Sequence, residues 1–352
     1  MVSSLTLRDF RSYPALDLAL EPGLVLVAGP NGAGKTNLLE SLHVAIQGYS
    51  PRTRVDANLV RFGGAGFDVR AAGRAERGDV SLEVEYRGGE GKRARVNGEP
   101  AWSMESLRAE ATALVFTPDR LAVVKAGPAV RRAYVDRVVG RVFPARVALA
   151  AEYAEALSQR NAALRRVAAA LADAGSVDPW DERLLVAAES LAAARAAAVG
   201  ALSPGFGERA GELGLEQATL AYEPSAVTAE VLADRFSADV ERGLTGAGPH
   251  HDELRITAGE RSLRAHGSQG EQRVAVLALL LAEAELLAAR RSVPPLLLLD
   301  DVLSELDGDR RAALVERIRG AAQVLVTAAA RGALPGDPDQ LLEVRPGRVD
   351  AA

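Results

Sequence analysis

The sequence predicts an α/β fold in which a phosphate-binding loop joins a buried strand to a helix, with a helical domain inserted into the chain. Three observations predict it. Residues 29–36 read GPNGAGKT and fit the pattern G-x-x-x-x-G-K-[ST]. A run of leucines at residues 296–299 is followed by two aspartates. Between them, from about residue 119 to 212, the composition changes to Ala and Arg.

Residues 1–118 are expected to form the first part of the nucleotide-binding domain. Leu5, Leu7 and Phe10 alternate as on one face of a strand, and the short apolar run at 24–27 is typical of a strand buried on both faces. Residues 59–96 are predicted to form antiparallel strands, and the Asn-Gly pair at 97–98 predicts a hairpin turn. Residues 111–116 are predicted to form another buried strand.

The loop at 29–36 is followed by a segment, 37–46, whose apolar residues recur three and four apart, as in a helix. Glycines let backbone N–H groups approach phosphate oxygens, and the helix start adds unpaired donors. Lys35 is expected to reach the outer phosphates, and the Thr36 hydroxyl to ligate Mg²⁺. The loop therefore predicts binding of a nucleoside triphosphate, through Gly29, Pro30, Asn31, Gly32, Ala33, Gly34, Lys35, Thr36 and Asn37.

Residues 119–212 are predicted to form an inserted helical arm of two helices. The helices are separated by a break at 175–179, and the second is expected to end before Ser203 and Pro204. Two helices joined by a short turn pack antiparallel.

Residues 213–352 are expected to return to the nucleotide-binding domain. The pattern predicts strands at 218–222 and 254–257, a long helix from Gly270 to about Arg290, and then strand, helix and strand. That last order is typical of a parallel sheet.

Asp300 and Asp301 follow the leucine strand, at the end where open α/β sheets bind their ligands. We expect Asp300 to hold Mg²⁺, directly or through water, and Asp301 to polarise or position the attacking water. The alternative is a buried strand followed by an ordinary turn.

Ser268 and Glu271 stand three residues apart ahead of an apolar helix, which is the pattern of a capping box. A hydroxyl and free N–H groups at a helix start also suit a terminal phosphate. Because a hydroxyl both donates and accepts hydrogen bonds, Ser268 can serve both purposes.

Composition limits the remaining possibilities. The 352 residues include no cysteine, which excludes disulfides and thiolate zinc sites, and four histidines, so a metal would be held mainly by oxygen ligands, as suits Mg²⁺. The net charge of −5 leaves room for a local basic face. Charged residues interrupt any signal peptide or membrane span, so a cytoplasmic protein with no membrane contact is expected.

These motifs occur in a fixed order: the phosphate loop, Ser-x-Gly-x-Gln, the paired aspartates and then Ser304-Glu305-Leu306-Asp307. This order resembles that of the ABC-type ATPase head, which has mixed and antiparallel sheets around its phosphate loop. The resemblance implies that Ser268, Gly270 and Gln272 contact the ATP held by a second subunit. Two heads would then enclose two ATP molecules in a head-to-tail dimer.

Within that group the chain resembles the RecF family of bacterial DNA replication and repair ATPases, which is similar to SMC-type heads with a short arm. The matching segments span most of the chain, at residues 7–13, 31–40, 131–136, 159–161, 248–250, 268–273 and 300–307. The resemblance implies ATP-dependent dimerisation, binding of double-stranded and gapped DNA, slow DNA-stimulated hydrolysis, and cooperation with RecR and RecO in loading RecA. Arg11, close to the loop in sequence, joins the expected nucleotide contacts.

The chain departs from the related ATPases at three places. Asp301 stands where many have Glu, which fits slow turnover, and Thr327 where transporters have His. We keep Lys35, Asp300, Asp301, Ser268 and Thr327 as the expected catalytic group. His251 replaces an Arg of the family pattern, and the adjacent residues 250–253 chelate metal poorly because neighbours on a strand point to opposite faces.

Two other functions stay open. An ABC transporter subunit would associate with membranes, and a P-loop small-molecule kinase would act as a monomer without Ser268. Arginine forks suit DNA phosphates, and the candidates are Arg52, Arg54, Arg61, Lys92, Arg93, Arg95, Arg131, Arg132, Arg160, Arg165 and Arg166.

Overall fold

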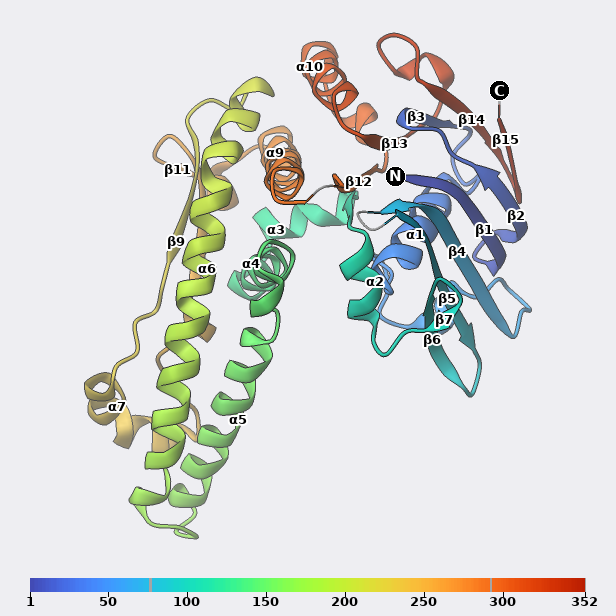
Figure 1. Ribbon diagram of the computed structural model, residues 1–352. Helices are drawn as coiled ribbons and strands as arrows, with labels where there is room; N and C mark the ends of the chain where they lie inside the picture. Colours follow the sequence, from blue (N-terminus) through green and yellow to red (C-terminus); the bar gives the residue numbers. More distant parts are fainter. Residues whose placement is uncertain (76–77, 292, 352) are drawn as a thin grey trace. The chain divides into compact units, whose positions relative to one another are not determined.

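The structure is a computed structural model that describes residues 1–75, 78–291 and 293–351. These residues form two compact units, each described here by itself (Figure 1). The first unit comprises Met1–Leu121, Glu212–Gly214 and Leu280–Ala352, and the second Ala122–Gly211 and Leu215–Leu279. The three-part division at residues 118 and 212 stays a prediction.

An antiparallel sheet forms one layer of the first unit, in the order β2-β1-β4-β5-β6-β7. Leu5, Leu7 and Phe10 of β1 are fully buried on one face, as their alternation predicts. Asn97 and Gly98 both have positive φ, so the predicted hairpin turn is confirmed. The strands are β1 (Val2–Phe10), β2 (Tyr13–Ala19), β4 (Gly66–Ala75), β5 (Gly78–Arg87), β6 (Gly91–Val96) and β7 (Glu99–Pro100).

A mixed sheet forms the second layer, in the order β15-β14-β3-β13-β12-β8. Its strands run parallel from β14 to β8, and β15 is antiparallel to β14. Every residue of β8, β12 and β13 is buried, which confirms the buried strands expected at β8 and β12. The strands are β3 (Gly23–Ala28), β8 (Ala113–Phe116), β12 (Leu296–Leu299), β13 (Gln323–Ala328), β14 (Gln340–Arg345) and β15 (Arg348–Ala351).

Helix α1 (Lys35–Gln47) lies in the core shared by the two sheets. Its residues from Leu38 to Gln47 are all buried, so the helix has no solvent-facing side beyond its first turn. One hydrophobic cluster joins Leu42 of α1 to Val69 of the antiparallel sheet and Leu298 of the mixed sheet. This packing ties the phosphate loop, which opens α1, to both layers. The unit also contains α2 (Met104–Glu110), the end of α9 (Gln269–Ala288) and α10 (Gly308–Arg319), with short 3-10 turns at Asp56–Leu59, Pro118–Leu121, Leu303–Glu305 and Arg331–Ala333.

The second unit is mainly helical, with a small sheet in the order β11-β10-β9. The predicted antiparallel packing of its two long helices is confirmed, because Tyr153 and Ala156 of α5 share a cluster with Leu191 and Ala188 of α6 (Figure 1). Its elements are α3 (Ala122–Lys125), α4 (Pro128–Val142), α5 (Leu149–Ala168), α6 (Asp178–Glu212), β9 (Ala218–Glu223), α7 (Ala229–Arg242), β10 (Glu253–Ala258), β11 (Arg261–Ser262), α8 (Leu263–His266) and the start of α9 (Gln269–Ala288).

Helix α6 corrects one prediction. The expected stop before Ser203 is wrong, because the helix continues through Pro204 to Glu212. Proline removes one backbone donor and crowds the residue four positions back, which here is Gly200, without a side chain. Beyond the proline the helix buries Phe206 and Ala210, and that burial offsets the lost hydrogen bond.

By length and composition alone, α6 is also long and apolar enough to cross a membrane. The helix nevertheless buries Arg195, whose guanidinium donates to the Asp136 carboxylate at 2.7 and 3.0 Å. The same guanidinium donates to Asp252 Oδ2 at 2.8 Å. A core helix of a folded unit passes the same test of length and composition, and α6 packs as one.

Candidate nucleotide-binding site

The phosphate loop connects the end of β3 to α1, in the strand-to-helix setting that its sequence predicts. Two of its glycines are required by close packing. A Cβ at Gly29 would lie 2.3 Å from the Val344 carbonyl oxygen, and one at Gly34 would lie 2.9 Å from the Tyr13 hydroxyl oxygen. Gly34 caps α1 with a φ of 114°, which side-chain-bearing residues rarely adopt.

The side chain of Lys35 folds back onto the phosphate loop. Its Nζ donates hydrogen bonds to the carbonyl oxygens of Gly29 at 2.7 Å and Pro30 at 3.0 Å. The ammonium is thus held beside the backbone N–H groups of the helix start, where two sources of positive charge face the same space. Such an arrangement of charge suits the outer phosphates of a nucleotide.

Asp300 is the centre of a hydroxyl–carboxylate cluster at the end of β12. The Thr36 hydroxyl lies 2.9 and 3.0 Å from its two oxygens, and the Thr327 hydroxyl donates to Oδ1 at 2.8 Å. Residues far apart in sequence therefore meet as predicted for a Mg²⁺ site, because β13, which carries Thr327, lies between β12, which precedes Asp300, and β3, which leads into the loop and Thr36.

Burial raises the pKa of Asp300, more than hydrogen bonds from Thr327 and Thr36 lower it. A buried carboxylate with this bias gains from a cation nearby. Thr36 and Asp300 together offer hydroxyl and carboxylate oxygens, the ligands that Mg²⁺ prefers. These residues fit a magnesium site on the donor set and the charge.

Asp301 follows with its backbone in the left-handed region, at φ 51°, and its side chain exposed. Its N–H donates to the Thr327 hydroxyl oxygen at 2.7 Å, and its carbonyl accepts from Ser304 Oγ at 3.0 Å. The turn points one carboxylate inward and the next outward, so the two aspartates can play different parts.

Arg11, an expected nucleotide contact, is held in an ion pair beside the loop. Its guanidinium donates twice to the Glu40 carboxylate, at 2.9 Å each, and once to Asn58 O at 2.7 Å. Arg52 donates to the same buried carboxylate at 3.2 Å. Two guanidinium groups thus share one carboxylate and leave one positive charge in excess, so a role for Arg11 toward nucleotide stays a prediction.

Three residues with no predicted role support the loop. Glu40 anchors Arg11 and Arg52; the Tyr13 hydroxyl donates to Gly34 O at 3.0 Å; and Ser12 Oγ accepts from the Asn37 amide at 3.0 Å. Sequence reasoning missed these supports because their partners are 20 to 40 residues away in most cases, and no local spacing marks the contacts.

Ser268 opens α9 in the second unit and forms the predicted capping box. Its N–H donates to Glu271 Oε2 at 2.7 Å, and its hydroxyl accepts from the Glu271 N–H at 3.2 Å. Hydrogen bonding by the Ser268 N–H, by Arg261 and by the Ser268 hydroxyl lowers the pKa of Glu271. Gln272 is buried and donates to Leu263 O at 2.8 Å, Gly270 is partly buried in the first turn, and Ser268 is exposed.

The candidate DNA-contacting arginines divide sharply by burial. Arg131 and Arg160 are 3% and 0% exposed and form ion pairs with Glu253 and with Asp181 and Asp239, so predicting them as phosphate contacts is wrong. Most of the others are partly or fully exposed and already bonded to acids or carbonyls, namely Arg52, Arg61, Lys92, Arg93, Arg95, Arg132 and Arg165.

Arg54 and Arg166 are exposed and lack an ion-pair partner among the residues that the structure describes. They are the candidates whose guanidinium forks can bind a phosphate without giving up an existing bond.

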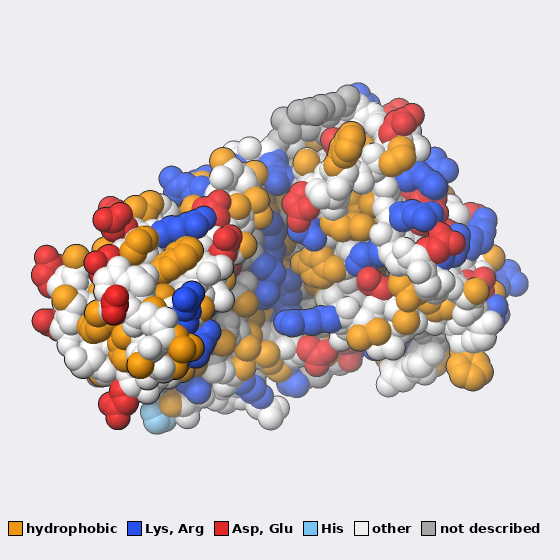
Figure 2. Space-filling model, turned by 90° about the horizontal axis from the view of Figure 1, so that it is seen from below, with side chains coloured by type: hydrophobic (Ala, Val, Ile, Leu, Met, Phe, Trp, Pro, Cys, Tyr) orange, Lys and Arg blue, Asp and Glu red, His pale blue; other side chains and the backbone are white. Residues whose placement is uncertain are grey.

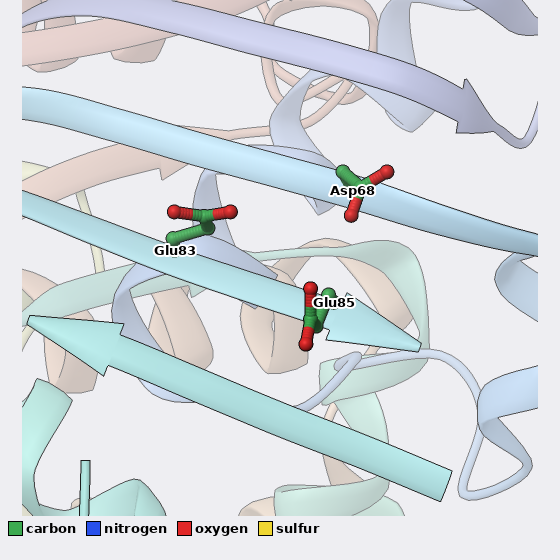
Figure 3. Close-up of side chains that lie close together, drawn as sticks. All are labelled: Asp68, Glu83 and Glu85. Atoms are coloured by element: carbon green, nitrogen blue, oxygen red, sulfur yellow. The ribbon is translucent and has the colours of Figure 1, made fainter. Parts of the chain in front are cut away.

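A group of three carboxylates on the outer face of the antiparallel sheet is close enough to suggest a cation site. Figure 3 shows Asp68 on β4 with Glu83 and Glu85 on β5, and their ligand atoms lie within 4.8 Å of one another. Arginines neutralise this group: Arg87 pairs with Asp68, and Arg93 and Arg95 pair with the two glutamates. Cross-strand ion pairing accounts for the cluster without a metal.

Comparison with known proteins places the whole chain in one family. A family model described as RecF/RecN/SMC N terminal domain matches residues 1–348. The chain is 38% identical to the DNA replication and repair protein RecF of Frankia alni, over 96% of this chain and 95% of that protein. It is 37% identical to the protein of the same name from Myxococcus xanthus, over 98% and 96%.

The solved structures agree with the sequences. A structure of the recombination mediator protein RecF with ATP, from the RecFOR pathway, superimposes with a TM-score of 0.89 at 25% identity, covering 100% of this chain and 97% of that one. The Smc head domain of Pyrococcus furiosus, bound to the C-terminal domain of ScpA, gives 0.61 at 16% identity, covering 100% of this chain and 95% of that one, and shows a shared fold alone.

Proposed function

The chain belongs to the RecF family of DNA replication and repair proteins, within the RecF/RecN/SMC family of ATPase heads, and from this premise we propose that it is an ATP-driven dimer switch acting on DNA. The observation that carries the proposal is the cluster of Thr36, Asp300 and Thr327 beside the phosphate loop. The lysine of this loop donates hydrogen bonds to the loop's own carbonyl oxygens.

ATP is the expected ligand of the loop. Lys35 would exchange two carbonyl partners for β- and γ-phosphate oxygens, and the N–H groups of the loop would bind the remaining oxygens. Thr36 and Asp300 would hold Mg²⁺, which neutralises charge that develops between the phosphates during hydrolysis. Asp301, exposed at the turn, would orient the attacking water, and one methylene less than Glu suits slow turnover.

The Ser268 hydroxyl would complete the site of a second copy. Its lone pair already caps α9, and its proton would turn from the Glu271 carboxylate to the γ-phosphate held by the partner's loop. The first N–H groups of that helix would bind the same phosphate. Because this contact exists only with a triphosphate between two chains, ATP would favour the closed dimer and hydrolysis would release it.

The closed dimer would bind double-stranded and gapped DNA through exposed arginines such as Arg54 and Arg166. Backbone contacts of this kind weaken steeply with salt and read little sequence. We place the protein in the cytoplasm, with RecR and RecO as partners in the loading of RecA, and we expect DNA to stimulate its weak ATPase activity.

Sedimentation with and without ATP, and with duplex DNA, tests the proposal on the parent and two variants. Ser268→Arg should stay monomeric with ATP. Ser268→Asp is the sharper variant, because Asp caps a helix as well as Ser while its charge repels a γ-phosphate. It should match the parent in thermal stability and nucleotide affinity, yet fail to dimerise.

If the parent stays a monomer at saturating ATP and does not bind duplexes, the switch is wrong. Phosphate transfer to a small acceptor by that monomer would indicate the kinase alternative. ATP hydrolysis that responds to a membrane partner, and not to DNA, would indicate the transporter alternative.

A further inference from the structure

The second unit carries a groove between α5 and α6 that the nucleotide switch does not use. Its floor is formed by small and apolar side chains, including Ala156 and Ala187, above the cluster that packs the two helices together. Val186 stands in it with 69% of its surface exposed. An apolar side chain exposed singly is ordinary on a protein surface, so Val186 counts here only together with the small and apolar side chains around it and the charges that flank them.

The groove is lined by carboxylates. Glu152 and Glu155 of α5 and Glu182 of α6 line it, against a single basic residue, Arg183. Arg183 approaches Glu155 at 4.0 Å with both side chains more than 60% exposed, which is a weak contact. Glu152 and Glu182 have no ion-pair partner among the residues that the structure describes. Figure 2 shows acidic and hydrophobic side chains interspersed over the helical unit.

Helical spacing sets these groups in line. Glu182, Val186 and Ser190 are four residues apart and so lie along one face of α6. Two turns of helix separate the first from the last, about 12 Å at about 1.5 Å per residue. The groove therefore presents Val186 and the neighbouring alanines flanked by negative charge, over the length that two or three turns of an opposing helix would cover.

We propose that this groove is a docking site for a positively charged, amphipathic helix of a protein partner. Lys or Arg side chains one turn apart would pair with Glu152 and Glu182, and an apolar residue between them would cover Val186 and contact Ala187. The three carboxylates repel phosphates, so DNA does not fit here. The inference rests on the proposed function in one respect, since it takes the partner to be a protein that the switch recruits.

The test measures binding of purified RecR, alone and with RecO, to the immobilised full-length protein at low and moderate salt. Glu152→Lys combined with Glu182→Lys should weaken binding at least about tenfold and flatten its salt dependence. Val186→Asp should weaken it as much, and Val186→Ile should not. Glu241→Lys, an exposed glutamate of α7 outside the groove, is the matched control and should stay within about twofold.

Thermal unfolding, ATP-dependent dimerisation and duplex binding are measured on the same variants and should match the parent. If the parent neither dimerises with ATP nor binds DNA, the switch is wrong. The groove proposal still holds in that case if RecR binds to the groove. Parent-like RecR binding by both groove variants overturns the groove, as does a parent that binds neither RecR nor its mixture with RecO. If the groove variants instead lose self-association without ATP, the occupant is a second copy and the proposal is wrong.

Discussion

The Thr327 hydroxyl joins both aspartates of the site, donating to Asp300 Oδ1 at 2.8 Å while accepting from the Asp301 N–H at 2.7 Å. One buried hydroxyl thereby orients the inner carboxylate and fixes the turn that exposes the outer one. These two hydrogen bonds give a physical reason for Thr at the position where transporter ATPases have His, because the Thr327 hydroxyl contacts both aspartates directly.

Thr327→Val should lower the rate of ATP hydrolysis with little change in KM. The isosteric change removes the donor to Asp300 and the acceptor of Asp301, and losing a hydrogen bond to a charged group costs about 1.5–3 kcal/mol, or roughly 10- to 100-fold in rate. Thr327→Ser restores the hydroxyl and should retain most activity. Steady-state hydrolysis with DNA present measures the difference. Equal kcat values for Val and Thr would show that the hydroxyl does not matter.

Asp300→Asn should stabilise the nucleotide-free protein at neutral pH. Burial raises the pKa of Asp300 in the folded state above its unfolded value. The folded state then binds more protons between those two values, so stability falls as pH rises through that interval and stays lower at pH 7. An amide is neutral, and it can accept from Thr327 and donate to Thr36.

Thermal unfolding without nucleotide should therefore show a higher midpoint for Asp300→Asn than for the parent at pH 7.5. Adding Mg²⁺ and ATP should raise the midpoint of the parent more than that of the variant, because the variant lacks a metal ligand. Asp301→Asn, at an exposed position, should leave the nucleotide-free midpoint unchanged. A lower midpoint for Asp300→Asn would contradict the pKa argument.

His250 should make the second unit less stable in mild acid. Its Nδ1 lies 2.6 Å from the Tyr153 hydroxyl oxygen and its Nε2 2.9 Å from Thr245 O, an arrangement that satisfies the neutral ring. Burial lowers its pKa, and the adjacent His251 and Arg132 act in the same direction, while the Thr245 carbonyl and Asp252 oppose them. The unfolded chain binds the proton first, so stability is complete above about pH 6.5 and declines as pH falls below it.

Urea unfolding between pH 5 and 8 checks this. The parent should lose stability below about pH 6.5, and His250→Gln should lose less over the same interval. Tyr153→Phe removes the group that donates to neutral Nδ1, and its profile should also flatten. If all three profiles have the same slope, His250 is not the group responsible.

Variants of Arg160 and Arg166 should have separate effects, one on the stability of the fold and the other on DNA binding. Arg160 is fully buried and donates to Asp181 at 2.6 Å and to the buried Asp239 at 2.9 Å, so Arg160→Met removes the closest charge partner of Asp239 and should cost about 3–5 kcal/mol of stability. Arg166, six residues on along the same helix, is exposed.

Arg166→Ala should therefore unfold with the parent yet bind duplex DNA more weakly, with a salt slope smaller by about one. Chemical denaturation and DNA titrations at several salt concentrations measure the two effects. Unchanged DNA affinity at every salt concentration would remove Arg166 from the candidate contacts.

The sequence by itself determined the elements in which local spacing carries the information. The glycines and Lys35 define the phosphate loop, four leucines define a strand buried on both faces, and Ser268 with Glu271 defines a capping box. Each follows from chain geometry within a few residues, and so does the α5–α6 pair.

Only the tertiary structure decided which side chains meet across the fold. The contacts of Asp300 with Thr36 and Thr327 span 264 and 27 residues, and the burial of Arg160 depends on Asp239, 79 residues away. An arginine in a surface patch and an arginine buried in the core have the same letter and similar neighbours in sequence. Their environments differ because packing between distant segments decides which charged groups remain hydrated.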